Sequence, residues 1–192
     1  MPTDPIARFR RWLDQARGTR VPLPEAMALA TAGADGRPSV RFVLLKEVDR
    51  RGFAFFTDAR SRKGRELRAS RRAAAVFYWD RLGKQVRVEG PIEEVSALEA
   101  DAYWETRPRP SRLAALASMQ SAPLPSRARL TALWRRLGRE YRGKHIPRPR
   151  EWTGFRVIPE AIEFWIRGED RLHHRELFRR TRRGWERKLL QP

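Results

Sequence analysis

The chain contains no cysteine among its 192 residues. This absence excludes a disulfide scaffold, a thiolate metal site and a thiol nucleophile. The chain also lacks any run of roughly 18 apolar residues, the length that a membrane helix needs. Its charged start, residues 1–15, has no apolar segment like that of a signal peptide. Together these absences favour a protein that makes no membrane contact and resides in a reducing interior, such as the cytoplasm.

Acidic residues are scarce relative to basic ones. The chain has 23 Asp and Glu against 42 Lys and Arg, a formal net charge of +19. Such a surface attracts anions, whether nucleic acid, acidic lipid or small phosphorylated ligands. A basic barrel that binds nucleic acid is one alternative, but the predicted strands lack an obvious series of exposed aromatic residues for base stacking. We therefore expect most of the charge to be solvated surface, with no specific nucleic-acid partner.

What is present suffices for one domain over residues 1–192, with 41% hydrophobic residues and seven tryptophans. Asp4 and Pro5 begin an amphipathic helix over 4–17. Hydrophobic periodicity and turn signals predict further helices at 61–70, 96–106 and 126–141, and strands at 26–32, 39–46, 53–57, 73–79, 84–95, 153–159, 161–168, 173–180 and 185–190. The proline-punctuated stretch 107–126 has room for a helical turn or two. Short strands joined by tight turns indicate an antiparallel barrel with flanking helices.

Two basic clusters are candidate phosphate sites. Residues 61–63 (Ser-Arg-Lys) lie where a strand gives way to a helix, so free backbone N–H groups and two cations coincide there. Arg107, Arg109 and Ser111 lie in a proline-stiffened loop, where arginine offers bidentate geometry to a phosphate. A capped surface helix and a solvated loop are the alternatives for these two clusters.

Arg41 and Lys46 are five residues apart on a predicted strand, which places them on opposite faces if the strand is regular. Lys46 ends an apolar run and is expected to be solvated.

The segment 163–175 gathers Trp165, Arg171, His173 and Arg175 near a strand. Arg171 and His173 are two residues apart and would share one face of an extended chain. Adjacent His173 and His174 diverge on a strand, and no third ligand has helpful spacing, so no metal site is expected.

Taken together, these segments resemble the pyridoxamine 5′-phosphate oxidase family from about residue 5 to the C-terminus. The resemblance rests on the order and spacing of residues 41–46, 55–64, 85–90, 103–111, 120–121, 152–157, 162–165 and 171–175. It implies an FMN-binding split barrel, a Greek-key antiparallel barrel with flanking helices. It also implies a homodimer with the flavin at the subunit interface, in which the C-terminal strands (about 152–192) complete the dimer and the active site.

The resemblance implies specific roles. The FMN contacts would be Arg41, Phe42, Val43, Leu44, Leu45, Lys46, Phe56, Thr57, Arg62, Lys63, Gln85, Gln120, Ser121, Trp165 and Arg175. The substrate phosphate would be held by Lys46, Tyr103, Arg107 and Ser111, and Arg171, Leu172 and His173 would lie against the substrate, with Arg171 and His173 catalytic. The implied reaction oxidises pyridoxamine or pyridoxine 5′-phosphate to pyridoxal 5′-phosphate with O2, giving H2O2. A related FMN oxidase acting on another ring, such as a dihydrophenazine, is the alternative.

The sequence departs from the family pattern at a few positions. Phe56 stands where the family often has tyrosine, Leu116 where it often has tryptophan, and His174 where an acidic residue is common. The arm before the first helix is shorter than in many members, so we expect no substrate-covering role for it. None of these departures touches the positions expected to bind the substrate phosphate.

Overall fold

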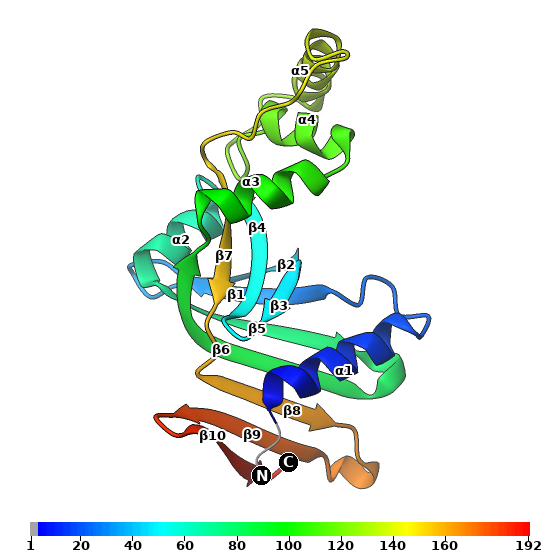
Figure 1. Ribbon diagram of the computed structural model, residues 1–192, viewed down its shortest axis with the longest axis vertical. Coiled ribbons are helices and arrows are strands. Elements are labelled where there is room, and N and C mark those ends of the chain that lie inside the picture. Colours follow the sequence, from blue (N-terminus) through cyan, green and yellow to red (C-terminus); the bar gives the residue numbers. More distant parts are fainter. Residues whose placement is uncertain (1–3) are drawn as a thin grey trace.

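The structure, a computed structural model, describes residues 4–192 (Figure 1). The helices are α1 (Pro5–Arg17), α2 (Arg62–Ser70), α3 (Ala97–Thr106), α4 (Arg109–Ala117) and α5 (Arg127–Glu140). The strands are β1 (Ala26–Ala32), β2 (Pro38–Leu44), β3 (Glu47–Asp49), β4 (Gly52–Asp58), β5 (Arg72–Trp79), β6 (Lys84–Glu94), β7 (Trp152–Val157), β8 (Ala161–Ile166), β9 (His174–Thr181) and β10 (Gly184–Leu190). Short 3-10 turns lie at Asp80–Leu82 and Glu169–Arg171.

The long strand β6 joins the two halves of an antiparallel sheet (Figure 1). Residues 84–89 of β6 pair with β8, and this half of the sheet has the strand order β10-β9-β8-β6-β5-β1-β2. Residues 92–94 of β6 pair with β7, which pairs in turn with β4, and β4 pairs with β3. The strand changes partners at Gly90, where an added Cβ would lie 1.9 Å from the carbonyl oxygen of Ile158. Only glycine fits this close approach. The predicted antiparallel, mainly β fold with flanking helices is confirmed.

Helix α1 closes the main core. Asp4 caps it by accepting a hydrogen bond from the Ile6 N–H at 2.9 Å. Its predicted apolar face is buried, and Phe9 contacts Phe53 and Phe77 with ring centroids 4.8 Å apart in each case. These contacts bury large aromatic side chains between α1 and the sheet, and each buried side chain stabilises the fold by about 1.5–3 kcal/mol.

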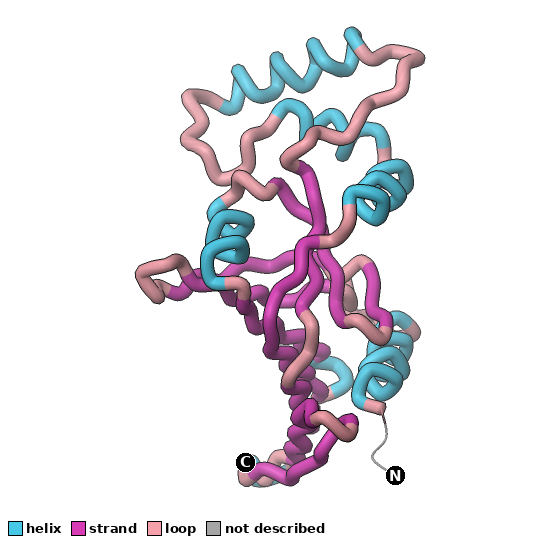
Figure 2. Tube along the Cα trace, turned by 60° about the vertical axis from the view of Figure 1, so that its left-hand side comes forward, coloured by secondary structure: helices cyan, strands magenta, loops and turns pink. Residues whose placement is uncertain are grey.

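A second, smaller core supports α3, α4 and α5, which gather at one end of the elongated molecule, with β8–β10 at the other (Figures 1 and 2). Its buried residues are Trp104, Leu113, Ile146 and Trp152. A capping box begins α3, because Ser96 and Glu99 exchange backbone and side-chain hydrogen bonds.

The structure differs from the sequence-based expectation in two local respects. The stretch after α3 contains a nine-residue helix, α4, longer than the turn or two that its prolines suggested. Pro108 and Pro110 lie at its start, where a missing N–H breaks no hydrogen bond, so they begin the helix rather than interrupt it. The strand expected over 39–46 ends at Leu44, and the short strand β3 follows it.

No helix within residues 4–192 is long and apolar enough to cross a membrane. The arm before α1 lies almost wholly outside the described residues.

A candidate cofactor and substrate site

A cavity of about 650 Å³ lies beside β2 and β4, at the end of the molecule that carries α3 and α4. Most of its lining consists of residues assigned to FMN or substrate from sequence: Arg41, Phe42, Val43, Leu44, Lys46, Phe56, Thr57, Lys63, Tyr103, Arg107, Ser111, Gln120 and Ser121. Pro108 and Trp152 complete the lining. The fold thus brings together segments that are far apart in the chain, although their roles stay predictions.

Arg41 and Lys46 both line this cavity, as do residues 42–44 between them. Burial alternates along this stretch from partly buried Arg41 to exposed Lys46, as expected for residues five apart on a strand. Just beyond the end of β2 at Leu44, the N–H of Lys46 donates to the carbonyl oxygen of Ala54 on β4. The Lys46 ammonium lies 5.9 Å from the centre of the Tyr103 ring, so it faces the cavity rather than open solvent alone.

Leu45 and Arg62, which are also assigned to FMN, lie near this cavity in the chain but do not line it. Leu45 is buried in the main core. Arg62 directs its Nε to Glu66, at 2.8 Å, and its side chain is largely exposed.

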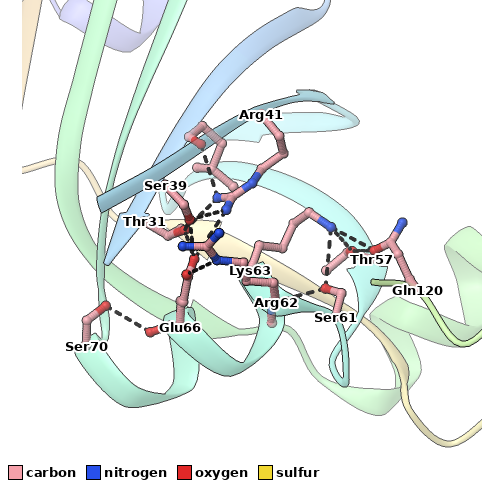
Figure 3. Close-up of polar contacts among 12 residues, drawn as sticks. Thr31, Ser39, Arg41, Thr57, Ser61, Arg62, Lys63, Glu66, Ser70 and Gln120 are labelled. Atoms are coloured by element: carbon pink, nitrogen blue, oxygen red, sulfur yellow. Dashed lines mark hydrogen bonds and ion pairs between the residues drawn. The ribbon is translucent and has the colours of Figure 1, made fainter. Parts of the chain in front are cut away.

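The start of α2 provides a buried cation. Ser61 caps the helix by accepting a hydrogen bond from the Gly64 N–H at 3.2 Å. Lys63, two residues further along the chain, is only 8% exposed. Its ammonium donates to Gln120 Oε1 at 2.7 Å and to Thr57 Oγ1 at 3.2 Å (Figure 3). Burial, and secondarily the charge of Arg41, lowers the pKa of Lys63 to about 8. An anion placed here would regain the electrostatic energy that burial of the ammonium costs.

Stacked aromatic rings form one wall of the cavity. Phe56 stacks on Tyr103 with ring centroids 4.1 Å apart and on Trp152 at 5.5 Å. Gly154 makes room for this stack, because a Cβ there would lie 2.7 Å from the Phe56 ring. The sequence indicated Trp152 only as part of the family segment 152–157. Its contact with Phe56, which is far away along the chain, produces no pattern in the neighbouring residues that would identify it as a site residue.

Arg107 has an unfilled hydrogen-bonding position. Its guanidinium lies over the rings of Trp152 and Trp104, 4.6 and 5.1 Å from their centres. Its Nη1 is buried without a hydrogen-bond partner among residues 4–192. Burial lowers the pKa of Arg107; the interaction with Tyr103 opposes this shift, and the charge of the neighbouring Arg112 adds to it. A buried charged donor without an acceptor is costly unless a ligand supplies one.

A second group of the predicted residues lies on β6, β8 and β9. Gln85 pairs with Trp165, and Trp165 pairs with Arg175, so these three side chains form a row across adjacent strands. The His173 ring packs against Trp165 with centroids 4.6 Å apart, and its Nδ1 accepts from the Gly168 N–H at 3.3 Å. None of this group lines the cavity within one chain.

Arg171 and His173 do not share one face of an extended chain, contrary to expectation. Arg171 belongs to a 3-10 turn, and both Asp170 and Arg171 have left-handed backbone conformations, with φ of 48° and 64°. The strand β9 begins only at His174. Such conformations are uncommon for residues with a Cβ, so the surrounding structure must impose this turn. Arg171 is exposed.

Comparison with known proteins gives the same family as the motifs. Residues 13–166 match the family described as pyridoxamine 5′-phosphate oxidase, and residues 152–192 match the pyridoxine 5′-phosphate oxidase C-terminal dimerisation region. A pyridoxine/pyridoxamine 5′-phosphate oxidase from Myxococcus xanthus (strain DK1622) is 49% identical over 192 residues, covering 100% of this chain and 93% of that protein. Its counterpart from Thermosynechococcus vestitus is 52% identical over 189 residues, covering 98% of this chain and 89% of that protein.

Solved structures share the fold. The crystal structure of PhzG from Burkholderia lata 383, in complex with tetrahydrophenazine-1-carboxylic acid, has a TM-score of 0.95 at 38% identity and covers 100% of this chain and 94% of that chain. A pyridoxamine 5′-phosphate oxidase-related, FMN-binding protein from Nostoc punctiforme has a TM-score of 0.78 at 18% identity, covering 100% of both chains. The fold class is therefore the predicted split barrel with flanking helices. The chain belongs to the pyridoxamine 5′-phosphate oxidase family, a family of oxidoreductases.

Proposed function

We propose that this protein is an FMN-dependent oxidase that converts pyridoxamine or pyridoxine 5′-phosphate to pyridoxal 5′-phosphate, with O2 as acceptor and H2O2 as product. The observation that carries the substrate assignment is the buried, unpartnered Nη1 of Arg107 in a cavity that also presents Lys46, Tyr103 and Ser111. A phosphate monoester supplies the acceptor that this guanidinium lacks, and the lysine and hydroxyl groups add further donors.

The other donors of the cavity suit the phosphate of FMN. Lys63, Arg41 and the capped start of α2 present cations and backbone N–H groups together, which is a common arrangement for binding phosphate. Bound FMN would supply the redox chemistry, acceptance of hydride from the substrate's exocyclic carbon and transfer of two electrons to O2. The protein's own contribution is to orient the substrate and to exclude water around that carbon.

We further propose that the active site forms between two subunits. Strand β2 borders the cavity and exposes Val40 (68%) and Phe42 (77%), an apolar surface that a second subunit would cover. The group on β6, β8 and β9 lies outside the cavity of its own chain, and part of it falls within the match to a dimerisation region. In a symmetric dimer that group can reach the cavity of the other subunit. Arg171, Leu172 and His173 would then lie against the substrate.

The test of this proposal is the cofactor and reaction of the purified protein. We expect it to release FMN rather than FAD on denaturation, and to oxidise pyridoxamine or pyridoxine 5′-phosphate with matched O2 uptake and H2O2 release. The unphosphorylated vitamers serve as control substrates and are expected to react far more slowly at equal concentration. A protein that binds no added FMN would contradict the proposal.

A second candidate is an oxidase of a dihydrophenazine, favoured by the similarity to PhzG. Two observations favour the first candidate. The chain is more similar in sequence to the two pyridoxine/pyridoxamine 5′-phosphate oxidases than to PhzG. A substrate without phosphate would also leave the buried Nη1 of Arg107 without an acceptor. Faster oxidation of a dihydrophenazine carboxylic acid than of either phosphorylated vitamer would reverse the order.

FMN affinity is expected to fall as the pH rises above about 8, the pKa of Lys63 in the free protein. The phosphate dianion favours the protonated ammonium, so binding raises this pKa and takes up a proton at alkaline pH. The affinity for FMN is retained below about pH 8 and decreases by up to about tenfold for each pH unit above that value. Flavin fluorescence quenching across this range would measure the effect. Lys63→Gln should bind FMN weakly with a flattened pH profile, and a wild-type profile unchanged to about pH 10 would contradict the assignment.

A further inference from the structure

A buried carboxylate lies behind the predicted FMN phosphate site. Glu66, in the second turn of α2, is 8% exposed. Its Oε2 accepts hydrogen bonds from Thr31 at 2.5 Å, Ser39 at 2.6 Å and Arg41 at 3.2 Å, and its Oε1 accepts from Arg62 at 2.8 Å (Figure 3). One side chain thus connects β1, β2 and the first turn of α2.

This network leaves Arg41 little freedom. Its Nη1 donates to Thr31 Oγ1 at 2.5 Å and to the Leu29 carbonyl oxygen at 3.2 Å, while its Nη2 donates to Ser39 and Glu66. Burial opposes ionisation of Glu66, but the hydrogen bonds outweigh it and lower its pKa to about 2. The acid is therefore a carboxylate at neutral pH, and it holds one partly buried and one largely exposed arginine by charged hydrogen bonds.

A carboxylate next to a phosphate site has two opposing effects. Its charge repels the phosphate, which weakens binding. Its hydrogen bonds fix the arginines in place before the ligand arrives, which strengthens binding because less side-chain freedom is lost on association. Three cations, Arg41, Arg62 and Lys63, and the one carboxylate leave two positive charges, which a phosphate monoester dianion neutralises.

We propose that Glu66 is a positioning residue for the phosphate of FMN, and that it acts by holding Arg41 and Arg62 while it makes no contact with the ligand itself. The proposal rests on the proposed function, since it needs the FMN phosphate to bind at the start of α2. It assigns to Glu66 a net favourable effect on FMN binding, opposite in sign to that of its charge alone.

The experiment compares FMN with riboflavin, which has the same ring system but no phosphate. Affinities of the apoprotein for both would be measured by flavin fluorescence quenching. Glu66→Gln is expected to weaken FMN about tenfold or more and to leave riboflavin affinity unchanged. Glu66→Asp, which keeps the charge, should restore part of the loss. Tighter FMN binding by Glu66→Gln, or equal weakening of both flavins, would overturn the proposal.

Two further proteins keep the test decisive. Glu94→Gln is the matched control. Glu94, on β6, pairs with Arg68 of α2, and neither residue lines the cavity. The affinities of this variant for both flavins should equal those of the wild type. If Glu66→Gln does not fold, Ser39→Ala removes one donor to the carboxylate from a partly exposed position. It should lower the ratio of FMN to riboflavin affinity, and an unchanged ratio would count against the role. If the wild type binds FMN no better than riboflavin, the FMN site itself is misassigned, a result distinct from an indifferent Glu66→Gln.

Discussion

Reassembling Arg107→Ala and Arg171→Ala subunits together is expected to recover roughly a quarter of the wild-type oxidase activity at low substrate concentration, although each variant alone is nearly inactive. Arg107 lines the cavity, and Arg171 lies outside it, in the turn between β8 and β9. If each site combines the cavity of one subunit with the turn of the other, a mixed dimer has one intact site and one site with both defects. Random pairing makes about half of the dimers mixed, so about a quarter of all sites are intact.

The matched control pairs two defects on the same side. Lys46→Ala and Arg107→Ala both alter the cavity, so every site of their mixed dimer carries one defect and no activity should return. Activity would be assayed after joint dissociation and reassembly, with each variant reassembled alone as the baseline. The absence of recovery from Arg107→Ala with Arg171→Ala, in mixtures shown to contain mixed dimers, would mean that the two arginines serve the same subunit's site.

The second large effect separates binding from catalysis. Arg171→Ala is expected to slow maximal flavin reduction by about 100-fold while FMN stays bound, because a donor near the reacting carbon acts mainly in the transition state. Arg107→Ala should instead raise the Michaelis constant roughly 10- to 150-fold with little change in the maximal rate, since the phosphate is held equally in ground and transition states. Anaerobic stopped-flow reduction over a range of substrate concentrations would measure both quantities.

His173→Ala serves as the graded comparison for Arg171. Its ring packs on Trp165, and its loss should slow flavin reduction more mildly than the loss of Arg171. A normal saturated rate of flavin reduction in Arg171→Ala would show that Arg171 only binds substrate.

Much of the local structure follows from the sequence. Asp4, Ser61 and Ser96 begin helices where their side chains suggested, because an N-cap needs only a short-range hydrogen bond to the next turn. Most strands begin and end within two residues of the expected positions, since burial on one or both faces imposes a recognisable pattern. The same residues, in order and spacing, were enough to indicate the family.

The sequence by itself determined the elements, their caps and the membership of the family, since these depend on neighbours a few residues apart or on motifs in order along the chain. Only the tertiary structure decided which side chains meet. Lys63 donates a hydrogen bond to Gln120, 57 residues away along the chain, and Lys46 lines the same cavity as Arg41. It also decided the position of Trp152, the left-handed backbone at Arg171 and the attachment of Arg41 to Glu66. These depend on long-range packing, which sequence periodicity does not encode.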